Sequence, residues 1–415
     1  MALTPSQIYI ALPVMNEMER LPLLMQAIMD QTEQHHRLVV CVNQPNSWWN
    51  DPAHLHVCEE NQLTIRYLQL LDDKRIEIID RSSPGKGWPP KGNGIGVARK
   101  LLMDHISKIA NTDDIIISMD ADTVFSKEYF ASVAENLRIN PAASAIAIPY
   151  YHKLSYNQEL DRAMLRYEIY MRAFAINMWR IRSPYCFTAL GSAIALPVWA
   201  YRESGGMTPK LSGEDFYFLQ KIVKTGRLLH WNSEFVFPAT RLSDRVFFGT
   251  GPALTKGIDG DWNSYPVYNY QLFDQVAETY KLFGSLYTKD VATPLDNFLI
   301  GKFGELPWKG LRNNFKSPAH FIRACHEKID GLRILQFLKE SQPSDEKVSE
   351  AALSELLLLY KKQFPELITE QNIKVDFLQS SIASLDSTRD ILFEIEMHFR
   401  KIHWNDFTGL TTLYN

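Results

Sequence analysis

Two aspartates that follow an apolar run are the first candidates for chemistry. Residues 115–122 read IIISMDAD, so Asp120 and Asp122 come directly after a stretch that suits a buried strand. Side chains alternate along an extended chain, and residues two apart therefore point to the same side. Asp120 and Asp122 can bind one object together. If that object is a divalent cation, the pair is a metal site, and if it is water, the pair belongs to a turn.

A second group of carboxylates lies further along the chain, in the sequence Ser212-Gly213-Glu214-Asp215. Two interpretations stay open for it. Ser212 and Asp215 have the spacing of a capping box, which satisfies free N–H groups at a helix start and would make Asp215 structural. Alternatively, Asp215 is a general base at the helix start, with Glu214 beside it. One of the two carboxylates can cap the helix while the other reacts.

The glycine-rich loop PPKGNGIGVARK (89–100) is a third candidate, but it matches neither common nucleotide-binding fingerprint. The spacing GxGxxG would require glycine at position 97, where Val97 stands, and no G-K-[ST] sequence follows. The loop carries Lys91 and leads into a helix that contains Arg99. Free N–H groups at a helix start favour an anion. The plain alternative is an ordinary loop followed by a solvated helix face.

The composition excludes several classes of protein. The chain has 415 residues and is 46% hydrophobic, which suffices for one large core or two domains. A net charge of −4 and a pI near 6.3 argue against a polybasic nucleic-acid binder. The four cysteines form no CxxC pair and no zinc-ligand spacing, which indicates a reduced intracellular protein. We predict no signal peptide, since basic residues are missing near the N-terminus.

The first half of the chain alternates short apolar runs with helical patterns. Strands are predicted at 8–14, 38–42, 76–80 and 114–120, and helices near 19–31, 52–62 and 94–109. This alternation is typical of an α/β protein with a mainly parallel sheet and helices on both faces. Ligands bind at the carboxyl ends of the strands in such sheets. The segments 13–17, 43–46, 80–91 and 120–122 are therefore expected to converge on one crevice.

The character of the sequence changes after about residue 260. Amphipathic helices are predicted near 269–283, 317–340, 349–363 and 387–403. We predict an α/β catalytic domain over 1–260 and a mainly helical C-terminal region over 261–415, either related to the acceptor or packed on the catalytic domain. Within the first of these regions lies an arginine-rich helical stretch at 158–182. We expect a core helix with a solvated basic face there, with an acceptor surface or a membrane-surface element as alternatives.

Taken in order, several motifs resemble those of a glycosyltransferase of the family 2 type with the GT-A fold: ALPVMNE, KGNGIGVARK, SMDAD, YRESGGM and GEDFYFLQKIVKTG. The resemblance covers about residues 7–250. A DxD pair alone is a weak signal, whereas five motifs in this order are specific. The resemblance implies a Rossmann-like GT-A domain that binds a nucleotide-diphosphate sugar with Mn²⁺ or Mg²⁺ and transfers the sugar to an acceptor hydroxyl.

The resemblance also implies roles for residues that bind the donor. Pro13, Asn16 and Glu17 would line the nucleotide pocket. Lys91 and Arg99 would lie near the nucleotide or its phosphates. The family often has the carboxylate-rich sequence DDGS after the second strand, where this chain has Asn43, Gln44 and Pro45. The amide of Asn43 can still hydrogen-bond a base or a ribose edge.

For the chemical step, the resemblance implies that Asp120 contacts the sugar nucleotide and that Asp122 is the main metal ligand, with Asp120 as the second. Asp215 would be the catalytic base, and Glu214 would help to position the acceptor or the sugar. A single base fits inversion at the anomeric carbon. A retaining GT-A enzyme and a sugar-phosphate nucleotidyltransferase stay as alternatives. The latter usually has a Gly-rich, Arg-containing loop after its first strand, where this chain has PVMNEMER.

Two arginines further on, Arg241 and Arg245, are candidates for contact with the diphosphate, because the planar guanidinium can hold two phosphate oxygens. The alternative is an ion pair with Asp244. The acceptor is expected to be a sugar, a lipid-linked molecule or another small molecule, and nucleic acid is not expected as a partner. We predict no transmembrane span and a cytoplasmic location, with peripheral contact to the inner face of a membrane left open.

Overall fold

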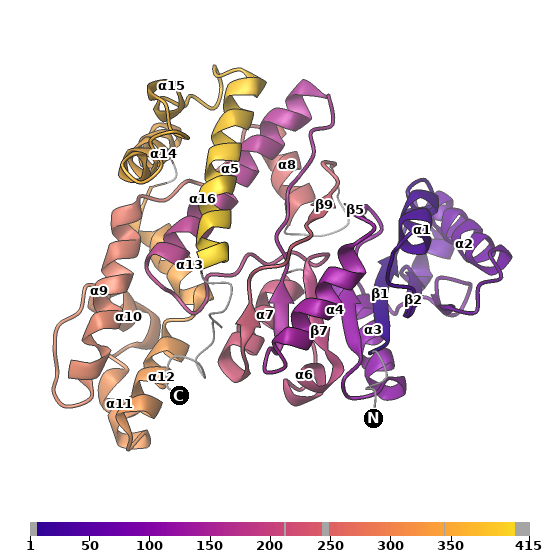
Figure 1. Cartoon of the computed structure of the whole chain (residues 1–415), viewed down its shortest axis with the longest axis horizontal. Helices are drawn as coiled ribbons and strands as arrows, with labels where there is room; N and C mark the ends of the chain where they lie inside the picture. The colour runs from indigo at the N-terminus through magenta and orange to yellow at the C-terminus, as the bar shows by residue number, and fades with distance from the viewer. Residues whose placement is uncertain (1–5, 211–212, 243–248, 344, 403–415) are drawn as a thin grey trace. The chain divides into compact units, whose positions relative to one another are not determined.

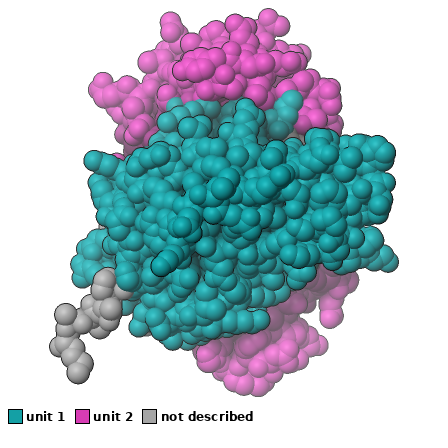
Figure 2. All heavy atoms as spheres, turned by 90° about the vertical axis from the view of Figure 1, so that its right-hand side faces the viewer, with its two compact units in different colours: residues 1–153, 189–222, 226–252 teal, residues 154–188, 223–225, 253–415 magenta. Residues whose placement is uncertain are grey.

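The computed structural model describes residues 6–210, 213–242, 249–343 and 345–402. The chain divides into two compact units, each built from separate stretches of sequence and coloured separately in Figure 2. Unit 1 comprises residues 1–153, 189–222 and 226–252, and unit 2 comprises residues 154–188, 223–225 and 253–415. The domain boundary that the sequence predicts near residue 260 stays a prediction.

Unit 1 contains the strands and the helices that connect them (Figure 1). Its strands are β1 (Ile8–Val14), β2 (His36–Asn43), β3 (Ile76–Arg81), β4 (Ile115–Ser118), β5 (Thr123–Phe125), β6 (Ala145–Ala147), β7 (Ile194–Pro197), β8 (Leu228–Leu229) and β9 (Val236–Pro238). Its helices are α1 (Leu21–Met29), the 3₁₀ turn η1 (Asn46–Asn50), α2 (Leu55–Leu70), α3 (Ile95–Ile109), α4 (Tyr129–Ile139) and α6 (Val198–Glu203). Helix α7 (Glu214–Thr225) begins in unit 1 and ends in unit 2, as does α8 (Thr250–Ile258).

Within the described residues, the main sheet has the order β3-β2-β1-β4-β7-β6-β8. Its first four strands are parallel, with β1 between β2 and β4. Every residue of β1 is buried, which means that both faces of this strand are covered. Helices α2 and α3 both contact β2. The chain moves outward from β1 to β3 and then returns to β4, and right-handed crossovers place such connections on opposite faces. The predicted α/β fold class is confirmed.

The other half of the sheet departs from parallel order, which the apolar runs alone do not reveal. Strand β7 runs antiparallel to β4 and to β6, and β6 pairs in parallel with β8. The register pairs Ser118 at the end of β4 with Ile194 at the start of β7. The loop that precedes β7 therefore reaches the same edge of the sheet as the residues that follow β4.

A small second sheet lies next to this edge. Strands β5 and β9 form an antiparallel ribbon in which Thr123 pairs with Pro238. Asp122 precedes β5 by one residue, and Arg241 follows β9 by three. The ribbon thus brings Asp122 and Arg241 to the same end, although they are far apart in the sequence.

The regular secondary structure of unit 2, within its described residues, consists of helices joined by loops (Figure 1). Besides parts of α7 and α8 it contains α5 (Gln158–Arg180), α9 (Tyr270–Leu286), α10 (Asp296–Phe303), α11 (Trp308–Asn314), α12 (Pro318–Lys328), α13 (Gly331–Ser341), α14 (Glu346–Lys361), α15 (Glu370–Ile373) and α16 (Ile382–Ile402). Apolar side chains of α5, α14 and α16 share one core. None of the helices in the described part of the chain has the length and apolar character that crossing a bilayer requires.

The basic face expected on the helical stretch 158–182 is not found in α5. Arg172 is buried and forms ion pairs with Glu168 on the same helix and with Glu396 on α16. Arg166 is buried, pairs with Glu346, and lies over the ring of Trp262. Helix α5 is largely buried, as a core helix should be, but the solvated basic face was predicted wrongly. Besides Glu168 on the same helix, the carboxylates that neutralise these arginines lie 180 and 224 residues away in the sequence, which a helical pattern does not show.

The single helix predicted at 317–340 is also wrong, because two helices occupy this stretch. Helix α12 ends at Lys328, and Asp330 caps α13 by accepting a hydrogen bond from the N–H of Arg333 at 3.1 Å. An aspartate that accepts from the third N–H of a following helix is a strong start signal. The apolar pattern continues across it and hides the break.

Candidate active site

The carboxyl ends of the parallel strands meet at one edge of the sheet, as the sequence predicts. Residue Val14 of β1 is paired with Val42 of β2, which is paired with Asp80 of β3. Beyond β4, the N–H of Met119 donates to the carbonyl of Ala11 at 3.2 Å. The segments 13–17, 43–46 and 120–122 therefore leave the sheet at the same edge.

Arg99 lies at the centre of this edge and is almost completely buried, with 2% of its side chain exposed. Its Nη2 donates to Oδ1 of Asp120 at 2.9 Å, and its Nε donates to Oε1 of Glu214 at 3.2 Å. Its Nη1 donates to Oγ of Ser118 at 2.5 Å and to the carbonyl of Gly191 at 3.0 Å. One guanidinium thus joins the end of β4, the loop before β7 and the start of α7.

Two glycines make this arrangement sterically feasible. A Cβ atom at Gly191 would lie 2.3 Å from Nη2 of Arg99, so any side chain there would displace the guanidinium. A Cβ atom at Gly96, in the first turn of α3, would lie 2.4 Å from the carbonyl oxygen of Lys210. Helix α3 therefore packs directly against the backbone that leads to α7. Gly96 thus serves close packing, whereas Gly92 and Gly94 take backbone conformations with positive φ.

The start of α7 bears on the interpretation of Asp215 as part of a capping box. The residue at the N-cap is Gly213, which has a left-handed backbone (φ 71°) and makes no side-chain capping bond. Asp215 is then the second residue of the helix, whereas a capping box would require the third. Ser212 lies outside the described residues. The carboxylate of Asp215 accepts a bond from the neighbouring N–H of Phe216 at 2.7 Å.

The environment of Asp215 gives its carboxyl an unusual proton affinity. Burial, and after it the charge of Glu214, raises the pKa of Asp215 to about 7 from 3.8, while the guanidinium of Arg99 opposes this rise. Glu214 itself is buried and bound to Arg99. A carboxyl with a pKa near neutrality can accept and release a proton at physiological pH, which is the property of a general base.

Asp122 lies in a second cluster of charges, at the end of the β5–β9 ribbon. The Nε of Arg241 donates to Oδ2 of Asp122 at 2.5 Å, and its Nη2 donates to Oε1 of Glu17. Glu17 is buried and Asp122 is 15% exposed, which makes both carboxylates costly to leave unpaired. Burial raises the pKa of Asp122, although Arg241 opposes this. Two carboxylates thus share one positive charge at the edge where a cation is expected.

The carboxylates after β4 fit a hard divalent cation that a ligand helps to bind. Within the described residues, no group of three or more His, Cys, Asp or Glu side chains is arranged to hold a metal. Asp120 and Asp122 each commit one oxygen to an arginine, and no partner among the described residues binds the other oxygen. Mg²⁺-type sites commonly use one or two carboxylates and take their other oxygens from phosphates and water. The residues present therefore fit such a cation together with a diphosphate.

The loop after β1 is held by a buried amide network. Asn16 adopts a left-handed backbone (φ 57°) and is exposed. Its N–H donates to Oδ1 of Asn61, whose Nδ2 donates to Oε1 of Gln44. Non-glycine residues in this conformation are uncommon, and asparagine tolerates it best. The network leaves the side chain of Asn16 pointing away from the core at the predicted nucleotide pocket.

The other residues predicted to bind the donor differ in their burial and in the hydrogen bonds that they already make. Pro13 is buried within β1. Asn43 is buried and donates to the carbonyl of Val14 at 3.0 Å, while its Oδ1 accepts from the indole N–H of Trp88 at 3.0 Å. This side chain ties the ends of β1 and β2 to the loop 82–94. Lys91 is exposed in that loop and makes no hydrogen bond or ion pair within the described part of the chain.

Sequence reasoning missed the partners of Arg99 and Arg241. The predicted ion pair of Arg241 with Asp244, and the role of Arg245, fall on residues 243–248, which lie outside the described residues. Ser118 and Gly191 were not singled out, although both accept hydrogen bonds from Arg99. The available signal was the spacing of Arg99 from Leu102, Met103 and Ile106, which places the arginine on the apolar face of α3, where it requires several acceptors.

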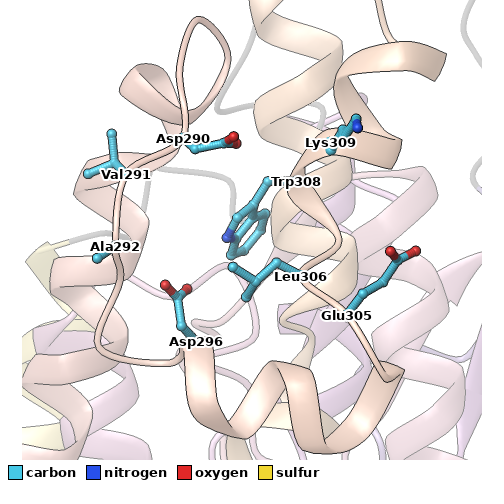
Figure 3. Close-up of a pocket in the computed structure, with 8 residues that line it drawn as sticks. All are labelled: Asp290, Val291, Ala292, Asp296, Glu305, Leu306, Trp308 and Lys309. Carbon is cyan, nitrogen blue, oxygen red and sulfur yellow. The ribbon is translucent and has the colours of Figure 1, made fainter.

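A cavity of about 370 Å³ lies in unit 2, apart from these residues in the sequence (Figure 3). It is lined by Asp290, Val291, Ala292, Asp296, Glu305, Leu306, Trp308 and Lys309. Two of its carboxylates already have partners, because Asp290 pairs with Arg312 and Asp296 accepts from Thr293. None of the residues implied by the motifs lies in it.

No sequence family matches this chain, and no curated protein sequence matches it. Solved structures similar to it include the mannosyltransferase PcManGT from Pyrobaculum calidifontis in complex with GDP-Man and Mn²⁺, with 12% identity, a TM-score of 0.41, and coverage of 98% of this chain and 90% of that one. Residues 1–349 of S. aureus TarS, in complex with UDP-GlcNAc, are 12% identical, with a TM-score of 0.38 and coverage of 95% of this chain and 92% of that one. Glucosyl-3-phosphoglycerate synthase from Mycobacterium tuberculosis, in complex with Mn²⁺, UDP and glucosyl-3-phosphoglycerate, is 12% identical, with a TM-score of 0.31 and coverage of 52% and 65%.

Proposed function

We propose that this chain is a metal-dependent glycosyltransferase that moves a sugar from a nucleoside-diphosphate donor to an acceptor hydroxyl, with inversion. One observation carries the proposal. Asp120 and Glu214, one from each of the two carboxylate groups that the motifs single out, are bound to the same buried arginine, Arg99. A turn or a helix cap would explain either carboxylate group separately, but neither would require one buried arginine to join them.

Asp215 is the proposed base. Its raised pKa of about 7 leaves a substantial ionised fraction at neutral pH and a high proton affinity, the combination that favours proton transfer. In the reaction, the acceptor oxygen forms a bond to the anomeric carbon while the bond from that carbon to the diphosphate oxygen breaks. The acceptor proton passes to the carboxylate of Asp215, and the nucleoside diphosphate leaves with the electron pair. One displacement of this kind inverts the anomeric carbon.

The diphosphate leaving group needs positive charge, and two kinds of group are proposed to supply it. Asp122, with Asp120, would hold Mn²⁺ or Mg²⁺, which stabilises the negative charge that develops on the leaving diphosphate. Arg241 is proposed to move part of its hydrogen bonding from Asp122 and Glu17 to the diphosphate when the donor binds. Arg245 is proposed as a second contact.

The nucleoside is proposed to bind over the ends of β1 and β2. Asn16 is exposed there with a left-handed backbone, and Pro13, Glu17 and Asn43 are buried at the ends of these strands. Lys91 has a free ammonium group in the neighbouring loop, which suits a phosphate.

A thermal-shift panel tests the proposal at the level of binding. The four common nucleoside diphosphates are each added with Mn²⁺ and with a chelator, and the melting temperature of the protein is followed. A ligand present at a hundred times its Kd stabilises the folded state by about 2.7 kcal/mol. We expect one or two diphosphates to stabilise the protein in Mn²⁺ and to lose most of this effect in the chelator. If no nucleoside diphosphate stabilises the protein in either condition, the proposed function is wrong.

A further inference from the structure

The environment of Arg99 is unlike that of an arginine that binds a ligand. Its guanidinium has five N–H groups, and the hydrogen bonds to Asp120, Glu214, Ser118 and Gly191 take up most of them. Only 2% of the side chain is exposed. A diphosphate would need a free edge of the guanidinium with two parallel donors. Arg99 offers no such edge, although the family resemblance implies that it lies near the phosphates.

What Arg99 does instead follows from the elements that it joins. Asp120 follows β4, Glu214 begins α7, and both carboxylates are bound to the same planar group through different nitrogens. The plane of a guanidinium fixes the directions of its N–H bonds, so two carboxylates bound to it are also fixed relative to each other. Asp215 is the next residue after Glu214 and shares its helical turn.

The surroundings hold the guanidinium itself in place. Ser118 accepts from Nη1 of Arg99 and donates to the carbonyl of Gly191 at 2.5 Å, so that the three groups form a closed set of hydrogen bonds. The backbone of Gly191 lies against Nη2, and Gly96 lets α3 approach the segment before α7. Arg99 therefore has one orientation, and this orientation determines where Asp120 and the start of α7 lie.

We propose that Arg99 is a positioning residue that sets the distance between the donor-binding Asp120 and the base on α7, and that it contacts neither the donor nor the acceptor. This inference rests on the proposed function for its kinetic consequence, but its structural consequence is independent of it. Without Arg99, Asp120 and the start of α7 lose their common hydrogen-bond partner. The segment after β4 and the first turn of α7 are then no longer held at a fixed distance from each other.

The test compares Arg99→Met with Arg202→Met, a control that removes another bridging arginine at an exposed position. Arg202 on α6 also joins two elements, since it donates to the carbonyls of Ser107 and Ala110 at the end of α3, but it lies outside the site. We expect Arg99→Met to lower kcat by about 10²-fold, the usual result of a misplaced reacting group. Affinity for the nucleoside diphosphate should fall far less than kcat, because Arg99 makes no direct contact with the donor and affects its binding only through Asp120. Arg202→Met should change neither quantity.

Hydrogen exchange gives a readout that does not depend on activity. Peptides covering 116–124 and 213–222 should exchange faster in Arg99→Met and unchanged in Arg202→Met. If Arg99→Met fails to fold, Arg99→Lys replaces it, since a lysine keeps the charge but cannot hold both carboxylates in a fork. The inference is overturned if diphosphate affinity falls tenfold or more while exchange stays normal, because Arg99 would then contact the donor.

Unchanged exchange at both segments would overturn it as well. If the wild-type protein binds no nucleoside diphosphate and transfers no sugar, the proposed function fails, and the exchange data alone then decide whether Arg99 joins the two segments.

Discussion

Replacement of Asp215 by asparagine should change turnover and folding stability in opposite directions. Asparagine has the shape of aspartate, and its Oδ1 can still accept the hydrogen bond from the N–H of Phe216. The charge is lost, and with it the ability to take a proton at neutral pH. Since Gly213 rather than Ser212 is the N-cap of α7, the substitution removes no capping bond.

The size of both effects can be worked from the structure. Loss of a positioned general base lowers kcat by about 10²–10⁴-fold, which corresponds to about 3–5 kcal/mol of transition-state stabilisation. Stability should change in the opposite direction. The pKa of Asp215 is raised from 3.8 to about 7, so that the ionised form disfavours the folded state by at most about 4 kcal/mol.

The sign of the pH dependence follows from this shift. Below pH 3.8 the carboxyl is protonated in both the folded and the unfolded state and costs nothing. Between pH 4 and 7 the unfolded state releases the proton first, so wild-type stability falls as the pH rises. The stability of Asp215→Asn does not fall in this way as the pH rises, because asparagine has no carboxyl proton to release. Its melting temperature should equal that of the wild type near pH 4 and exceed it at pH 8.

The assay is a pair of measurements on the same samples: melting temperature at pH 4.5 and pH 8, and turnover of the donor at pH 8 with Mn²⁺. We expect lower turnover and a higher melting temperature at pH 8. Normal turnover would refute the assignment of Asp215 as the base. A melting temperature lowered equally at both pH values would refute the reasoning about its buried charge and return Asp215 to a structural role.

The remaining predictions concern the other charged groups and the packing around Arg99. Asp122→Asn should abolish the part of nucleoside-diphosphate binding that depends on Mn²⁺, measured by titration calorimetry; retained metal dependence would remove Asp122 from the site. Arg241→Lys should weaken binding of a nucleoside diphosphate more than that of the nucleoside, and equal effects on both would assign Arg241 to its ion pairs with Asp122 and Glu17 alone. The wild-type kcat/KM should fall about tenfold per pH unit below pH 7, since Asp215 must be ionised in the free enzyme; a flat profile between pH 5 and 7 would argue against it. Gly191→Ala should lower both turnover and melting temperature, because its Cβ would lie 2.3 Å from Nη2 of Arg99, and normal values for both would show that the loop shifts freely.

The sequence predicts the parallel half of the sheet well because β1, β2 and β4 contain uninterrupted apolar runs, whereas β3 has charged residues within its apolar run and is half-buried. β1 is buried at every position and β2 at all but one, which is what a strand covered on both faces produces. Strand β7 is apolar in sequence, but its antiparallel direction follows from its pairing with β4, which it reaches after the long connection through α5. The direction of β7 is what brings Gly191 to the site.

The candidate site was predictable as a set of residue types and not as a set of contacts. Asp120 and Asp122 are two residues apart, and a strand end forces them to one side. Arg99 and Glu214 are 115 residues apart, and Arg241 and Glu17 are 224 apart. Such pairs leave no local pattern in the sequence. The one local sign is that Arg99 lies on the apolar face of its helix, where an arginine requires acceptors from other parts of the chain. The capping-box interpretation was wrong for a local reason, because α7 begins at Glu214 with Gly213 at its N-cap, which makes Asp215 the second residue of the helix and not the third.

Turnover of a nucleotide sugar followed by proton NMR tests the central claim most directly. The donor is the sugar nucleotide whose diphosphate stabilises the protein, and the signals of the anomeric proton report both cleavage and configuration. We predict release of nucleoside diphosphate in Mn²⁺, with a first-formed sugar product of inverted anomeric configuration, and loss of this release in Asp122→Asn and Asp215→Asn but not in Arg202→Met. Release that continues unchanged in a chelator, or that the two aspartate variants support at the wild-type rate, would contradict the assignment of this edge of the sheet as a glycosyl-transfer site.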